Sequence, residues 1–334
     1  MKNSVTDKVK EYLETRSPFK YKHIISVEEL PGGVSADVFR VTLRDGELII
    51  KCPLPRLKVE KDWFSDTKRG KNEFQALRIA SRILEHGDVP DPLFYDEERE
   101  MLIISAAPKE YVTWKSLLLK GYINSSIVEI LANKLALFHN ATRGKEFLSA
   151  DLINSSSLFH ELRLSPYFGP LLTIYKDSSE PIHEVIRILS QKRYSLVHGD
   201  FSPKNILTDG TSKVVILDWE VIHYGNPIFD LAFMCNHLTL KTFHLGKKEP
   251  DRWFDLIIKF YEKYLSAADS RLVDAPEFFK VLGALLLARV DGKSPAEYLT
   301  NEDKKLIRIF GLQVLDSTFN SIRDYCSEIR EQIS

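Results

Sequence analysis

Acidic residues follow two short apolar runs in the middle of this chain, and an amide lies between them. Asp200 follows the first run and precedes Asn205, whereas Asp218 follows the second run and precedes Glu220. Carboxylates that are brought together repel one another unless a cation lies among them, and hard oxygen ligands suit Mg²⁺ bound together with substrate phosphates. The residues therefore predict phosphoryl transfer, in which one carboxylate orients an acceptor hydroxyl while Asn and Asp hold the metal.

A turn signal lies between the two apolar runs. The dipeptide Asp209-Gly210 favours a tight hairpin, so we expect residues 196–199 and 214–217 to form short buried strands that pair through it. The four polar side chains would then meet at one edge of the hairpin. Each of them alone fits an ordinary loop residue better. The joint spacing H-G-D-x-x-x-x-N followed by D-x-E is what makes the prediction specific.

Residues 195–233 resemble the catalytic core of the aminoglycoside phosphotransferase and choline kinase superfamily. The resemblance implies an α+β, bilobal protein-kinase-like fold and the transfer of phosphate from ATP to a small molecule. It implies Asp200 as the catalytic base, with Asn205 and Asp218 as Mg²⁺ ligands. Glu220 is expected to add a further metal contact.

The same resemblance assigns supporting roles to two residues. Residues 224–231 are similar to the family's Y-x-x-x-x-F-D-[IL] segment, in which Asp230 would brace the catalytic loop without reacting. His198, the histidine of H-G-D, is expected to support the same loop structurally.

In the N-terminal part of the chain, apolar and polar residues alternate as they do in β-strands, most clearly in residues 38–43. This pattern predicts three antiparallel strands between residues 24 and 51, with a turn containing Gly32, Gly33 and Ser35 between the first two. Glycines there let backbone N–H groups approach phosphate oxygens. Lys51 ends the third strand where a kinase-like fold needs a cation for the α- and β-phosphates. A plain turn and an exposed strand-end lysine are the alternative readings.

A helix predicted over residues 71–86 carries Glu73 near its start, 22 positions after Lys51. Most glutamates on helix surfaces are merely solvated, so its pairing with Lys51 is expected only from the kinase-like fold. The proline-bearing loop between them also resembles the corresponding loop of 5-methylthioribose kinase.

Two further strands, at residues 93–95 and 101–104, complete a predicted five-stranded antiparallel sheet with one helix. Ser105 and Ala107 then lie in a hinge whose backbone would meet adenine, since Pro108 offers no N–H. We expect residues 1–107 to form a nucleotide-binding lobe. Residues 108–334 would form a larger, mainly helical lobe with the catalytic loop and a substrate cap.

Composition excludes several classes of protein. The 334 residues suffice for two lobes, and 46 basic against 47 acidic residues leave a net charge of −1, with no electrostatic footprint for nucleic acid. No apolar run approaches the roughly 20 residues of a membrane span, and the N-terminus lacks the apolar region of a signal peptide. Three scattered cysteines favour a reducing cytoplasm. The oligomeric state stays open.

Only twelve positions separate Asp218 from Asp230, which leaves no room for the long activation segment of a protein kinase. The acceptor is therefore expected to be a small polar molecule: sugar-like, an amino alcohol or an aminoglycoside. Arg289 is a candidate acceptor contact, because its segment resembles the substrate-binding region of 5-methylthioribose kinase; a surface arginine is the alternative. A nucleotide-binding pseudokinase scaffold without turnover is the rival function, and a preference for ATP over GTP is not determined.

Overall fold

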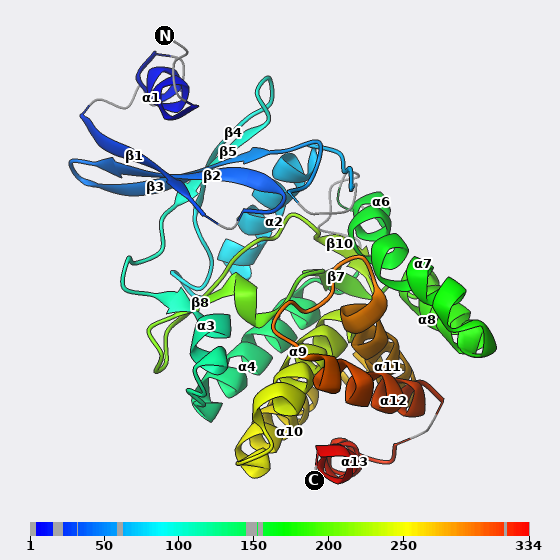
Figure 1. Ribbon diagram of the computed structural model, residues 1–334. Coiled ribbons are helices and arrows are strands. Elements are labelled where there is room, and N and C mark those ends of the chain that lie inside the picture. The colour runs from blue at the N-terminus through cyan, green and yellow to red at the C-terminus, as the bar shows by residue number, and fades with distance from the viewer. Residues whose placement is uncertain are drawn as a thin grey trace.

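A computed structural model of the chain describes residues 5–15, 23–31, 33–58, 63–144, 152, 156–316 and 319–333. The structure has two lobes (Figure 1): a sheet with one main helix, and a larger part made mostly of helices. The expected α+β, bilobal kinase-like architecture is confirmed.

One antiparallel sheet with the strand order β1-β2-β3-β5-β4 forms the N-terminal lobe. Its strands are β1 (Ile24–Leu30), β2 (Ala36–Leu43), β3 (Gly46–Pro53), β4 (Pro92–Asp96) and β5 (Met101–Ser105). Because side chains alternate along a strand, its residues divide between two cores. Phe39 and Ile50 pack on one face with Leu13 of α1 (Val5–Thr15), whereas Leu102 packs on the other with α2.

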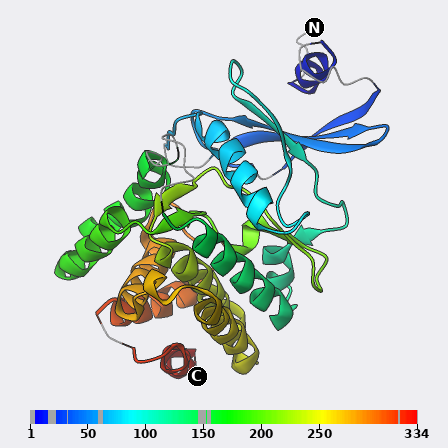
Figure 2. The same ribbon diagram turned by 180° about the vertical axis from the view of Figure 1, so that it is seen from behind.

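Helix α2 (Arg69–Ile83) lies between the sheet and the helical lobe, as Figure 2 shows from behind. It starts two residues before the predicted helix and ends earlier, because Leu84 takes an extended backbone and its N–H caps the carbonyl of Ala80. The amide of Asn72 donates to the carbonyls of Glu220 and Ile222, each at 2.9 Å. These bonds fix α2 against the segment that follows Asp218.

The second lobe is helical with short strands at its upper edge (Figure 1). Its helices are α3 (Trp114–Leu119), α4 (Ser125–Ala141), α6 (Ser156–Phe159), α7 (Ser165–Ile174), α8 (Ser179–Gln191), α9 (Ile228–Leu245), α10 (Pro250–Ala267), α11 (Ala275–Asp291), α12 (Asn301–Asp316) and α13 (Ile322–Ile333). A π-helical turn over His160–Leu164 joins α6 to α7. Helix α9 is the centre of the lobe, buried from Ile228 to Phe243. None of the described helices combines the length and the apolar character that crossing a membrane would need.

The strand pairing around the catalytic stretch differs from the expectation. Strand β7 (Ser195–Val197) pairs with β10 (His223–Gly225), and the hairpin through Asp209-Gly210 joins β8 (Ile206–Thr208) to β9 (Val214–Ile216). Strand β6 (Val112–Thr113) lies on the other side of β8. The expected pairing of the two apolar runs was wrong because the loop and the 3₁₀ turn Pro203–Asn205 separate β7 from the hairpin.

Candidate functional site

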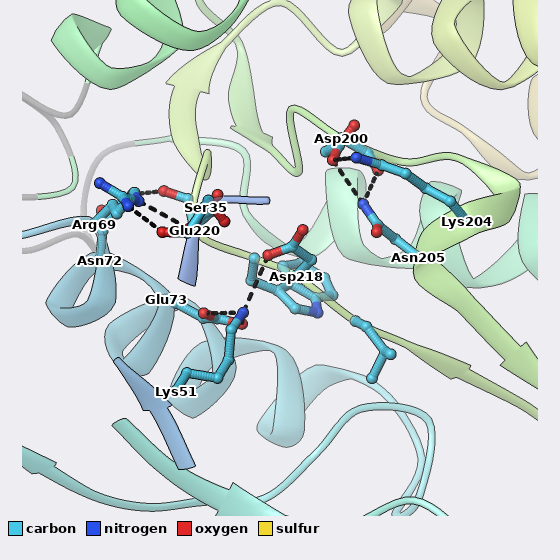
Figure 3. Close-up of polar contacts among 12 residues, drawn as sticks. Ser35, Lys51, Arg69, Asn72, Glu73, Asp200, Lys204, Asn205, Asp218 and Glu220 are labelled. Carbon is cyan, nitrogen blue, oxygen red and sulfur yellow. Dashed lines mark hydrogen bonds and ion pairs between the residues drawn. The ribbon is translucent and has the colours of Figure 1, made fainter. Parts of the chain in front are cut away.

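Asp200 lies in the loop after β7, where its side chain is 5% exposed and contacts Lys204, Asn205 and Arg163. Figure 3 shows the contacts with Lys204 and Asn205. Oδ2 accepts a hydrogen bond of 2.7 Å from the amide of Asn205 and lies 3.0 Å from Nζ of Lys204. Oδ1 lies 3.0 Å from Nη2 of Arg163. Burial alone would raise the pKa of Asp200, but the charges of Arg163 and Lys204 hold it below its ordinary value. The carboxylate is therefore ionised and fixed in orientation.

Asp230, near the start of α9, fixes the loop that carries Asp200 by hydrogen bonds to its backbone. The buried Asp230 carboxylate accepts the N–H groups of His198, at 2.6 Å, and Gly199, at 2.9 Å, and lies 3.2 Å from Nε2 of His139. His198 in turn lies 3.0 Å through Nε2 from the carbonyl of Leu217, which precedes Asp218. These contacts join the Asp200 loop to the Asp218 segment.

Gly199 is required by two constraints at this point of the loop. Its φ is +78°, and a Cβ atom would lie 2.7 Å from the carbonyl oxygen of Val221. Any residue with a side chain at this position would be strained, both by the left-handed backbone and by the close approach of Val221.

Lys51 lies between two carboxylates. Its Nζ is 2.6 Å from Glu73 of α2 and 3.1 Å from Asp218, which follows β9 (Figure 3). Burial alone would lower the pKa of Lys51, but Asp218 and Glu73 raise it above its ordinary value, so the lysine stays charged. Burial raises the pKa of Glu73, and Lys51 only partly offsets this. The expected approach of Lys51 and Glu73 is present in the structure.

Asp218 has a backbone conformation that is rare for residues other than glycine. Its φ is +66°, and its side chain is 25% exposed. Burial would raise its pKa, but Lys51 and Lys204 hold the pKa of Asp218 well below its ordinary value. The strained backbone is of the kind that accumulates at functional sites.

The oxygen donors near Asp200 and Asp218 suit a magnesium ion. Asn205 uses its amide nitrogen for Asp200, which leaves its carbonyl oxygen available, and Oδ1 of Asp218 faces Lys51. Within the described part of the chain, no three His, Cys, Asp or Glu residues lie close enough to hold a metal by themselves. Mg²⁺ is usually bound by one or two protein ligands together with phosphate oxygens and water, so two ligands fit.

Glu220 is buried next to Arg69 and Ser35, and not beside Asn205. Its carboxylate lies 3.2 Å from Nε of Arg69 and is hydrogen-bonded by the hydroxyl of Ser35 (Figure 3). Burial, followed by the charge of Asp218, raises the pKa of Glu220. Its expected metal contact remains a prediction, since the side chain is turned toward Arg69.

The turn between β1 and β2 comes close to Glu220 through Ser35. A Cβ on Gly33 would lie 2.3 Å from the carbonyl oxygen of Ala36, so the tight turn requires glycine. Gly32 lies outside the described residues. Arg69 connects this turn to α2 by donating to the carbonyls of Ser35 and Leu54.

The residues expected to contact adenine and the acceptor lie outside the group around Asp200 and Asp218, and their roles remain predictions. Ser105 ends β5, where its hydroxyl accepts the N–H of Asp91 at 2.8 Å, and Ala107 follows in the connection between the lobes. Arg289 is in α11, 8% exposed, with its guanidinium 6.0 Å from the centre of the Tyr167 ring.

Sequence reasoning missed three buried or partly buried cations of the site. Arg69, Arg163 and Lys204 contact Glu220 or Asp200, and none had been proposed. Lys204 carried a readable signal, because it lies inside the H-G-D-x-x-x-x-N motif. Arg163 is 37 positions from Asp200 in a π-helical turn, and no local pattern points to it.

Comparison with known proteins agrees with this geometry. Residues 26–271 match the model of the Phosphotransferase enzyme family. The chain is 24% identical over 258 residues to a 4-hydroxytryptamine kinase of Psilocybe cyanescens, an alignment that covers 64% of this chain and 68% of that protein.

Two solved structures show the same fold. The amicoumacin kinase hAmiN, in complex with AMP-PNP, Ca²⁺ and Ami, has a TM-score of 0.58 at 15% identity, covering 99% of this chain and 93% of that one. A choline/ethanolamine kinase family protein from Mesorhizobium loti has a TM-score of 0.53 at 14% identity, covering 99% and 94% of the two chains.

Proposed function

Since the chain belongs to the phosphotransferase enzyme family, we propose that this small-molecule kinase transfers the γ-phosphoryl group of ATP to a hydroxyl of a small polar acceptor. The observation that carries the proposal is the presence of two groups of polar side chains at the site. Asp200 is bonded to Asn205 in one group. Lys51 contacts Glu73 and Asp218 in the other. A solvated turn or an ordinary ion pair would not need this arrangement.

Asp200 is proposed to orient the acceptor hydroxyl. The acceptor oxygen forms a bond to the γ-phosphorus as the bond from that phosphorus to the bridging oxygen breaks, and ADP leaves. The hydroxyl proton passes to Oδ of Asp200 late in this step, because a loose transition state needs little activation of the nucleophile. Arg163 and Lys204 keep the carboxylate ionised beforehand.

Asn205 and Asp218 are proposed to hold Mg²⁺ through the amide carbonyl and a carboxylate oxygen. When bound, the ion neutralises charge on the phosphates. Lys51 is proposed to contact the α- and β-phosphates, with Glu73 fixing its position.

The remaining nucleotide contacts follow the same arrangement. The turn with Gly32, Gly33 and Ser35 is proposed to approach the phosphates, and the backbone at Ser105 and Ala107 is proposed to meet adenine. We place the boundary between the nucleotide-binding lobe, residues 1–107, and the helical lobe, residues 108–334, in the connection that follows β5.

The acceptor is proposed to lie between the lobes, because β10 leads directly into α9 after Asp218 and leaves no platform for a peptide. The relatives named above act on, or are solved with, hydroxytryptamine and amicoumacin, which are small molecules. A reducing cytoplasm is proposed as the compartment, since Cys52, Cys235 and Cys326 are all free thiols.

Substitution of Asp200 tests the proposal. Asp200→Asn and Asp200→Ala should lower kcat by about 10²-fold or more, because general-base groups contribute on that scale, while ATP binding measured by calorimetry is retained. Phosphate transfer to a panel of small hydroxyl compounds is the assay. Turnover close to that of the unmodified enzyme in both variants would refute the role of Asp200, and nucleotide binding without turnover across the panel would favour a scaffold.

A further inference from the structure

A buried lysine in α9 has no acidic partner. Lys241 is 1% exposed, and its Nζ donates to the backbone carbonyl of His237 at 3.2 Å. Among the residues that the structure describes, no other group accepts a hydrogen bond from this nitrogen. Within the described residues no carboxylate lies within 4.0 Å of this nitrogen. An ammonium group carries three donors, and a buried charge is normally paired, so Lys241 is incompletely compensated.

Two more cations and a phenol surround Lys241. The ring of Tyr298 lies 5.2 Å from Nζ of Lys241 and 5.9 Å from Nζ of Lys115, and its hydroxyl is buried without a hydrogen bond. Arg289 donates through Nη1 to Ser294, but its Nε is also buried and unpaired. We call Lys115, Lys241, Arg289 and Tyr298 the basic cluster.

The charge of the basic cluster is not balanced by the acids near it. Glu297 pairs with Lys115, and it is 66% exposed at the outer side of the cluster. Burial lowers the pKa of Lys241 to about 7, and Lys115 and Arg289 add to this effect. Burial and the charges of Arg289 and Lys241 likewise hold the pKa of His237 well below its ordinary value. Lys241 and His237 thus lack the stabilisation of their charged forms that a neighbouring anion would give.

The basic cluster is connected to Asp200 through the side chains of Tyr167 and Arg163. The Tyr167 ring contacts two guanidinium groups, that of Arg289 at 6.0 Å and that of Arg163 at 5.7 Å, and Arg163 is paired with Asp200. Lys115 is carried by α3, which packs against the Pro203–Asn205 turn. The segment between α11 and α12 that carries Tyr298 runs along the side of the helical lobe that faces the sheet (Figure 1).

We propose that the acceptor carries an anionic group, a carboxylate or a phosphate, on the same molecule as the hydroxyl that is phosphorylated, and that the basic cluster binds this group. The unpaired donors of Lys241, Arg289 and Tyr298 would suit a partner with several acceptor oxygens, which both anions provide. An acceptor with an amine at this place would be repelled. This inference rests on the proposed function, because it identifies the hydroxyl partner of Asp200 as part of an anionic molecule.

Direct binding tests the anion site without relying on turnover. Inorganic phosphate and glycerate are titrated calorimetrically into the full chain saturated with ADP and Mg²⁺, so that the nucleotide phosphate site is occupied. We expect both anions to bind the unmodified protein. Lys241→Met should weaken binding about 10-fold or more, because a hydrogen bond to a charged group is lost. Absence of binding, or equal binding by Lys241→Met, overturns the inference.

Two variants control this comparison. Lys280→Met removes an α11 lysine that is paired with Glu184, and its anion affinity should equal that of the unmodified protein. Lys115→Met, at the partly exposed side of the cluster, should weaken binding even if Lys241→Met does not fold. An affinity loss in Lys280→Met as large as in the cluster variants would also overturn the inference.

Turnover separates the inference from the proposed function. Matched acceptors are glycerate, glycerol 3-phosphate, glycerol and serinol, supplemented by a metabolite panel. We expect anionic acceptors to be phosphorylated, with KM raised about 10-fold or more in Lys241→Met. Transfer only to neutral or cationic acceptors overturns the anionic acceptor and leaves the kinase intact. Anion binding that depends on Lys241, without any ATP-dependent transfer, overturns the proposed function instead.

Discussion

Removing Arg163 should destabilise the protein through the charge it leaves behind on Asp200. The two side chains meet at 3.0 Å with side-chain exposures of 9% and 5%, so water cannot replace the guanidinium. Breaking a buried ion pair by deleting one partner costs about 3–5 kcal/mol. We therefore expect Arg163→Met to lower the free energy of unfolding by about that amount near neutral pH, measured by urea denaturation.

Lys204→Met is the matched control, because Lys204 contacts the other oxygen of the same carboxylate at the same distance of 3.0 Å but is 51% exposed. Water screens such a pair, so its loss should cost about 1 kcal/mol or less. Adding Asp200→Asn to Arg163→Met should recover part of the stability, since an amide carries no charge that needs a partner.

The pH dependence of Arg163→Met gives an independent check. Burial would raise the pKa of Asp200, but Arg163 and Lys204 hold it below the ordinary 3.8. A carboxyl group with a depressed folded-state pKa contributes stability above 3.8 that is lost as the pH falls through the folded-state value. The unfolded-state pKa of Asp200 is common to the unmodified protein and Arg163→Met, so their stability difference changes only between the two folded-state pKa values. The difference should be constant above the folded-state pKa in Arg163→Met, where burial is less offset, and should shrink as the pH falls from there to the depressed pKa of the unmodified protein. Equal costs for Arg163→Met and Lys204→Met, or no recovery with Asp200→Asn, would refute the reasoning.

Three further expectations follow from the site. Gly199→Ala should lower the free energy of unfolding by about 1–3 kcal/mol through backbone strain and contact with Val221. This loss should exceed that of Gly210→Ala, whose Cβ meets nothing closer than 3.7 Å. Equal losses in the two variants would contradict the role of the contact. Lys51→Met should lower kcat/KM for ATP by on the order of 10²-fold, because a positioned cation for the phosphates is lost, and a steady-state assay with unchanged values would exclude Lys51 from the phosphate site. Removal of divalent ions with EDTA should abolish turnover and Mg²⁺ should restore it, whereas full activity in EDTA would contradict the metal assignment to Asn205 and Asp218.

Local patterns predicted the strands and helices of the N-terminal lobe, whereas the bilobal fold was expected from the family resemblance. The alternation of residues 38–43 gave the sheet, and β2 places Phe39 and Val41 on one face as expected. The strand of Lys51 and the helix of Glu73 were both clear in the sequence, but their pairing was expected only from the kinase-like fold that the resemblance implies. Apolar alternation and helical periodicity report burial directly, which is why these elements were readable.

Long-range choices were not readable in the same way. Strand β7 is as apolar as β8, so composition could not decide which of them pairs with β9. Strand β10, the actual partner of β7, was not predicted as a strand. The partner of Asp200 depends on a π-helical turn, in which one extra residue per turn shifts Arg163 away from the face that 3.6-residue periodicity would assign.

The hydrogen bonds of Asn72 give α2 a mechanical role. Its amide joins α2 to the segment after Asp218, and the carbonyl of Asp88, shortly after the helix, accepts the N–H of Ile216 at 2.7 Å. The same helix is also bonded to the sheet side, because Arg69 donates to the carbonyls of Ser35 and Leu54, so α2 is a tie between the two lobes. A change in the angle between the lobes would therefore have to bend or break bonds at one end of α2, the helix from which Glu73 reaches Lys51.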